Sequence, residues 1–142
     1  MIDISRNFTS ILAASVLLAA GAVHAADLTV DIKGIATDKG NVMVALYKAA
    51  DPWLKTPSFG SGAPARTTGT SVRFKDLPEG EYAVSLYVDE NGNGRMDTNI
   101  VGIPTEPYAF SKNAAGSFGP PSFEQAKFSL GKDGKSIVIT LK

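Results

Sequence analysis

The chain has 142 residues, with 14 basic and 14 acidic side chains, so its formal net charge is zero. This length fits one domain rather than two, and the lack of a basic stripe or charge block excludes the usual basis of nucleic-acid binding. The sequence has no cysteine and one histidine, which excludes disulfides, zinc–thiolate sites and iron–sulfur clusters.

The N-terminal segment has the pattern of a secretory signal peptide. Arg6 precedes a short apolar run over residues 11–23, and Val23-His24-Ala25 places small residues around a cleavage position. The run is shorter than the roughly 18 residues of a membrane-spanning helix, which argues against an uncleaved anchor. We therefore predict a signal peptide over residues 1–25, no membrane span in the mature chain, and a periplasmic or secreted location. Cleavage would remove the only histidine, and with it every imidazole ligand or base.

Alternating hydrophobicity predicts β-strands throughout the remaining domain, residues 26–142. The expected strands are 28–35, 42–47, 70–74, 82–88, 123–130 and 136–141, with a short seventh near 100–101. The first two strands are expected to form a hairpin through a turn at 38–41. Segments 56–65 and 102–122 are rich in Gly, Ser and Pro and are expected to be loops. The pattern predicts an all-β fold, an antiparallel β-sandwich of about seven strands of the prealbumin or immunoglobulin-like type.

The residues after the strand 82–88 have the ligand spacing of a calcium-binding loop. Calcium takes six to eight oxygen ligands from a chain that bends sharply, with side chains at positions 1, 3 and 5, a glycine at position 6 and a carbonyl at position 7. Gly94 takes the glycine position. The expected ligands, by side chain except for the Arg95 carbonyl, are Asp89, Asn91, Asn93, Arg95 and Asp97.

The match to a complete calcium loop stops after Asp97. Position 12 is Ile100, where an EF-hand carries a bidentate glutamate, and no helix is expected on either side. A further oxygen must come from elsewhere, and Glu106 is the nearest acidic residue beyond the loop. Such a site would bind weakly, with a Kd of roughly 10⁻⁴ to 10⁻³ M. The alternative is a plain polar turn, since Asn-Gly is a strong turn signal and occurs twice here.

Catalytic chemistry is poorly supported, and we predict no catalytic residue. A nucleophilic serine would need a lysine as base, and the spacing of Ser129 and Lys132 falls at a strand exit rather than on a helix. A carboxylate-based hydrolase could pair Glu106 with Asp89 or Asp97. Nothing in the sequence sets the separation of these carboxylates, so an enzyme is the weaker hypothesis.

Several motifs resemble known families. Residues 77–84, Leu-Pro-Glu-Gly-Glu-Tyr-Ala-Val, resemble the turn and strand of prealbumin-like and collagen-adhesin B-type sandwich modules. Segments 89–99, 102–108, 110–111 and 119–123 together resemble the bacterial exported family called domain of unknown function 2141. The resemblance implies a Gram-negative exported sandwich without assigning an activity. Family members often carry a histidine where this chain has Val88, and this departure argues against an imidazole ligand and leaves an all-oxygen site as the consistent one.

The sequence thus predicts an exported module that binds calcium or is stabilised by it, and that recognises an unidentified protein or carbohydrate. The two alternatives are a structural or adhesion module without metal and the carboxylate-based hydrolase.

Overall fold

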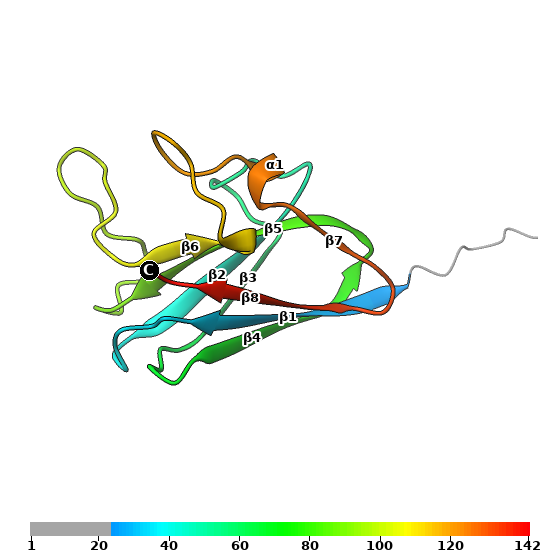
Figure 1. The fold of residues 1–142 in the computed structure, drawn as a ribbon, viewed down its shortest axis with the longest axis horizontal. Coiled ribbons are helices and arrows are strands. Elements are labelled where there is room, and N and C mark those ends of the chain that lie inside the picture. The colour runs from blue at the N-terminus through cyan, green and yellow to red at the C-terminus, as the bar shows by residue number, and fades with distance from the viewer. Residues whose placement is uncertain (1–23) are drawn as a thin grey trace, which may run out of the picture.

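The computed structural model describes residues 24–142 as a β-sandwich, in which two sheets pack face to face (Figure 1). Residues 1–23, most of the predicted signal peptide, lie outside the described residues. None of the helices described between residues 24 and 142 is long and apolar enough to cross a membrane.

The first sheet has three strands in the order β4 (Thr70–Pro78), β1 (Ala25–Lys33) and β8 (Lys135–Thr140). β1 runs antiparallel to β4 and parallel to β8. The second sheet contains β3 (Phe59–Pro64), β2 (Asn41–Lys48), β5 (Gly80–Asp89) and β6 (Tyr108–Phe110) in that order. A further short strand, β7 (Phe128–Leu130), pairs with the first part of β5, while β6 pairs with its middle. All strand pairs in the second sheet are antiparallel.

The core forms where the apolar faces of the two sheets meet. In β5 the alternating residues Tyr82, Val84, Leu86 and Val88 are buried, as the period of two predicts. One hydrophobic cluster combines these residues with the buried face of β1 and with residues of β4 and β8. The sandwich therefore buries one face of each sheet and leaves the outer faces, the edges and the loops accessible.

The predicted hairpin of the first two strands is wrong, because β1 and β2 belong to different sheets. The chain turns at Gly34, crosses between the layers, and enters β2 where Asn41 pairs with Asp89 of β5. Both strands have the expected buried faces. Alternation specifies which residues face the core, but it does not specify which sheet a strand joins.

Three further segments differ from the sequence prediction. Phe59–Pro64, expected as loop, forms the edge strand β3 beside β2. Ile100 and Val101 lie in an exposed turn, and the additional strand of this region is β6. The expected strand 123–130 begins as a short helix, α1 (Phe123–Ala126), before β7. The helix starts there because Ser122 and Gln125 form a capping box that satisfies backbone groups of its first turn.

Ser111, in the short 3₁₀-helix η1 (Ser111–Asn113), links β5 to α1 inside the protein. Its hydroxyl donates to the Ala126 carbonyl at 2.6 Å and accepts from the Val84 N–H at 2.9 Å, and the residue is fully buried. Replacing Ser111 by alanine leaves both backbone groups without a partner, and we expect a loss of about 2–3 kcal/mol in the free energy of unfolding. Urea denaturation measures this loss. The exposed Ser117→Ala is the control, and equal midpoints for the two variants would contradict the role of Ser111.

Candidate metal loop and neighbouring groove

Five of the six predicted metal ligands lie in the segment that joins β5 to β6, and the sixth, Asp89, is the last residue of β5. This segment, residues 90–107, projects from the second sheet near β6 (Figure 1). The Val88 N–H donates to the Pro107 carbonyl at 2.9 Å, which joins the two ends of the segment. We call residues 89–97 the metal loop.

The carboxylate of Asp89 organises the metal loop from within. Its Oδ1 accepts from the N–H groups of Gly92 at 2.9 Å and Asn93 at 3.1 Å, and its Oδ2 accepts from the Gly94 N–H at 2.8 Å. Only 2% of Asp89 is exposed. Gly92 and Gly94 both have positive φ, which glycine adopts without steric cost. The glycines therefore let the backbone coil around the aspartate.

Glu106 closes the base of the metal loop. One carboxylate oxygen accepts from the Glu90 N–H at 3.1 Å, and the other accepts from the Asp97 N–H at 3.0 Å. The residue is 8% exposed. Glu106 thus contacts the loop from outside it through backbone N–H groups, and its role as a metal ligand stays a prediction.

The asparagine side chains meet Asp97 on the outer side of the loop. The Asn93 amide donates to Asp97 Oδ1 at 2.7 Å, and the Asn91 amide donates to Asp97 Oδ2. Arg95 lies on the same turn, where its N–H donates to Asn93 Oδ1 at 3.0 Å. Side chains at positions 3, 5 and 9 of the predicted calcium loop therefore converge, as the spacing indicated.

The loop gathers negative charge that no basic side chain pairs within residues 24–142. The ion pairs described there involve Arg73 with Asp27 and Lys127 with two glutamates, all outside the loop. This charge affects the hydroxyl of Tyr87 on β5. Burial raises the pKa of that hydroxyl, and the carboxylates of Asp89, Glu106 and Asp97 raise the pKa further. Among the described residues, the carboxylates of this site accept hydrogen bonds from N–H groups but form no ion pair.

The carboxylate oxygens of the site are too few to hold a hard cation such as calcium, so the amide oxygens of the two asparagines would also have to act as ligands. Within residues 24–142, no group of three Asp, Glu, His or Cys side chains is arranged to hold a metal. Rotation of an asparagine amide exchanges its oxygen and nitrogen, so Asn91 and Asn93 can present oxygen in place of N–H. The Asp89 carboxylate uses three of its roughly four lone-pair positions on backbone N–H groups, which leaves one.

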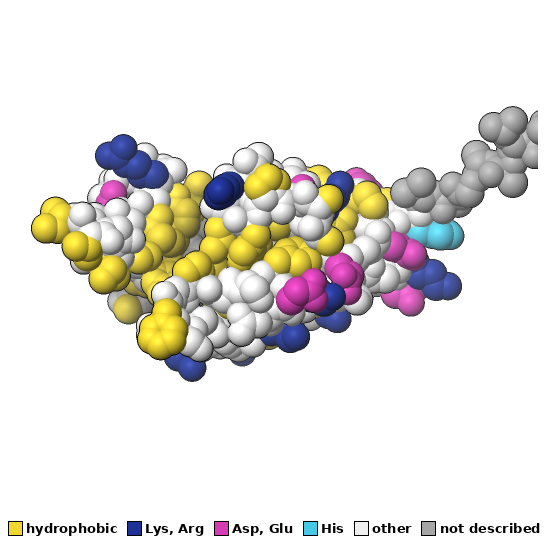
Figure 2. Space-filling view, turned by 90° about the horizontal axis from the view of Figure 1, so that it is seen from above, with side chains coloured by type: hydrophobic (Ala, Val, Ile, Leu, Met, Phe, Trp, Pro, Cys, Tyr) yellow, Lys and Arg dark blue, Asp and Glu magenta, His cyan; other side chains and the backbone are white. Residues whose placement is uncertain are grey.

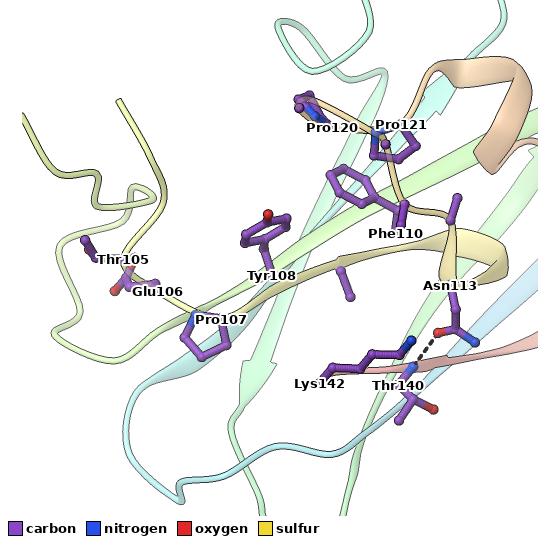
Figure 3. Close-up of a pocket in the computed structure, with 15 residues that line it drawn as sticks. Thr105, Glu106, Pro107, Tyr108, Phe110, Asn113, Pro120, Pro121, Thr140 and Lys142 are labelled. Atoms are coloured by element: carbon purple, nitrogen blue, oxygen red, sulfur yellow. Dashed lines mark hydrogen bonds between the residues drawn. The ribbon is translucent and has the colours of Figure 1, made fainter. Parts of the chain in front are cut away.

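A groove lies beside the metal loop and was not predicted from the sequence. Its volume of about 510 Å³ falls within the range of small-molecule sites. The rings of Tyr108 and Phe110 rise from the same side of β6 toward Pro120 and Pro121 (Figure 3). These two rings pack edge to face, with centroids 5.8 Å apart. Lys142 also lines the groove.

The groove could not be predicted from the sequence, because residues 102–122 have no regular period and the walls of the groove come from separate segments of the chain. Asn113 follows β6, and its Oδ1 accepts from the Thr140 N–H of β8 at 2.9 Å. That bond joins the edges of the two sheets and forms one side of the groove. The only sequence signal was the concentration of prolines and aromatic residues in a segment expected to be loop.

Comparison with known proteins gives one match. No curated protein and no solved structure matches the chain significantly. The family model described as "Uncharacterized protein conserved in bacteria (DUF2141)" matches residues 30–138, which include strands β2 to β7, the metal loop and the groove lining except Thr140 and Lys142. The chain therefore belongs to this bacterial family.

Proposed function

We propose that the protein is an exported β-sandwich module that binds calcium in the metal loop and is stabilised by the ion. The observation that carries the proposal is the convergence of Asn91, Asn93 and Asp97 in a loop whose carboxylates have no basic partner among residues 24–142. Calcium prefers carboxylate, amide and carbonyl oxygens in a flexible arrangement, and this loop supplies all three kinds.

The groove gives the module a place for a ligand. Segment 105–110 carries Glu106, which closes the metal loop, and also Tyr108 and Phe110, which line the groove. An ion that fixes the position of Glu106 would therefore also fix the groove wall. The half-exposed ring of Tyr108 offers an apolar face to a sugar or to a peptide side chain, so a carbohydrate or protein partner fits the groove.

A metal-free structural or adhesion module is the second candidate. It is favoured by the hydrogen bonds of Asp89 and Glu106, which hold the loop closed through backbone N–H groups without an ion. A carboxylate-based hydrolase has less support, because these two residues are almost fully buried and a polysaccharide could not reach them.

Calcium is expected to raise the melting temperature of the protein by about 5–10 °C at about 10 mM ion. A Kd of roughly 10⁻⁴ to 10⁻³ M gives about 1.4–2.7 kcal/mol of stabilisation at that concentration, and a domain of this size converts each kcal/mol into several degrees. The same concentration of magnesium should have a smaller effect, because magnesium demands tighter octahedral geometry. Differential scanning calorimetry measures both shifts.

The variant Asp97→Asn separates ion binding from folding. It keeps a side chain of the same size while removing one ligand charge, so it should lose most of the calcium shift. A second readout is the pKa of the Tyr87 hydroxyl, measured by absorbance as the difference between the parent and Tyr87→Phe. Calcium places positive charge beside the carboxylates that raise this pKa, so the pKa should fall when calcium binds. If the parent shows no calcium shift, or if Asp97→Asn shows the same shift as the parent, the metal proposal fails.

A further inference from the structure

Beyond the metal loop, the projecting segment ends in a cluster of exposed aliphatic side chains. We call residues 98–104, Thr-Asn-Ile-Val-Gly-Ile-Pro, the apolar tip. Ile100, Val101 and Ile103 are 103%, 72% and 59% exposed, whereas side chains of this type are usually buried. Apolar side chains gather at the end of the molecule opposite the grey N-terminal trace (Figure 2).

The apolar tip has a defined internal structure that keeps these side chains outside. Thr98 and Pro104 form an antiparallel bridge at its base. The Asn99 N–H donates to the Ile103 carbonyl at 2.9 Å, and the Gly102 N–H donates to the Asn99 carbonyl at 3.0 Å. The Asn99 side chain accepts from the N–H groups of Val101 and Ile103, both at 3.0 Å. Four backbone donors of the tip are thus satisfied within the tip itself.

These features suit a medium that has no hydrogen-bonding partners to offer. Inside hydrocarbon, each backbone polar group must be satisfied by the protein, and a charged side chain is costly. Four of the six backbone N–H groups of the tip are bonded within the tip, and the tip contains no charged residue. A protein surface would not require either property, since it can supply partners of its own.

The area of the tip is also too small for a stable pairwise protein interface. Its three aliphatic side chains expose on the order of 300–400 Å², within the size of an ordinary apolar patch, while a stable interface buries about 800 Å² from each partner. A convex cluster of this size fits a deformable apolar medium better than a rigid surface. Phe118, also fully exposed, lies on a loop across the groove and is a candidate for a second contact.

We propose that the apolar tip anchors the protein at a phospholipid bilayer by inserting Ile100, Val101 and Ile103 below the headgroups. The inference is independent of calcium binding, because the tip is formed by its own hydrogen bonds. Since the inserted residues are uncharged, attachment depends on apolar burial rather than on attraction to anionic lipid. It should therefore persist at high salt.

A site-specific fluorophore tests the proposal in the full chain. The sequence has no cysteine, so Ile103→Cys can be labelled uniquely with an environment-sensitive dye. Val138→Cys, at a half-exposed valine on β8, is the matched control. Vesicles of phosphatidylethanolamine and phosphatidylglycerol are added in the presence of a calcium chelator. The dye at position 103 should shift to shorter wavelength and the dye at position 138 should not.

Adding Ile100→Ser and Val101→Ser to the labelled chain should weaken vesicle binding at least about tenfold, because two aliphatic side chains are withdrawn from the bilayer. The proposal is overturned if positions 103 and 138 respond alike or if the serine substitutions leave binding unchanged. It is also overturned if the dye at position 103 shifts with protein concentration in the absence of vesicles. That result would assign the tip to an interface between copies of the chain. Because calcium is chelated throughout, none of these outcomes bears on the metal proposal.

Discussion

Replacing Gly40 by alanine is expected to lower the free energy of unfolding by about 2–5 kcal/mol. An added Cβ would lie 2.0 Å from the Asp89 carbonyl oxygen and 2.9 Å from the Glu90 Cα, so it would collide with backbone rather than with a movable side chain. The φ of +74° at this position adds roughly 1–2 kcal/mol for a residue with a Cβ. Overpacking against fixed backbone supplies the remainder, about 1–3 kcal/mol.

Chemical denaturation of Gly40→Ala measures this effect, and Gly119→Ala provides the matched control. No atom lies within 4 Å of the Cβ position of Gly119, so its substitution should change stability by less than about 0.5 kcal/mol. The two variants have the same chemical change and differ only in their surroundings. Similar midpoints for both would show that the connection between β1 and β2 does not pack against the start of the metal loop.

The second large effect is expected at Asp89. The Asp89→Ala variant should lose about 2–4 kcal/mol in the free energy of unfolding, even with calcium chelated. Three backbone N–H groups lose a charged acceptor in this variant, and hydrogen bonds to charged groups contribute about 1.5–3 kcal/mol each. The sum is reduced because water can reach the donors of the exposed residues Gly92, Asn93 and Gly94 once the loop opens.

Asp97→Ala is the informative comparison for Asp89. The Asp97 side chain accepts only from the amides of Asn91 and Asn93 on the outer side of the loop. Its loss should cost less than about 1 kcal/mol in the absence of calcium. Urea denaturation of both variants, with and without calcium, separates the role in holding the loop from the role in binding the ion. Asp89→Ala should be destabilised in both conditions. If Asp89→Ala were as stable as Asp97→Ala without calcium, the Asp89 carboxylate would not organise the loop.

The strands that sequence alone located best are those that alternate strictly. Tyr82, Val84, Leu86 and Val88 are buried as expected, because period two directly records which face of a strand is covered. β3 was missed because only Phe59 and Ala63 of this edge strand pack against the core, and the Gly, Ser and Pro residues around them are typical of loops. β6 was missed because three residues are too few to show a period.

The geometry of the candidate site was also predicted only in part. Spacing along the chain predicted that Asn91, Asn93 and Asp97 would come together, because neighbouring residues in a coiled loop have few arrangements. It did not predict that Asp89 would be held by backbone N–H groups, since that depends on positive φ at Gly92 and Gly94. The groove could not be predicted from spacing along the chain, because it forms where β6 meets the end of β8, and these strands are separated in the sequence.

The parallel pairing of β1 with β8 has a consequence for biogenesis. Leu28 pairs with Lys135 and Lys33 with Thr140, so the central strand of the first sheet pairs with a strand that follows all the other strands described. Contacts between such distant residues slow folding, because a long segment must be ordered before they form. The first sheet of a nascent chain would therefore stay incomplete until β8 has been synthesised, so the sandwich folds as one late event rather than strand by strand.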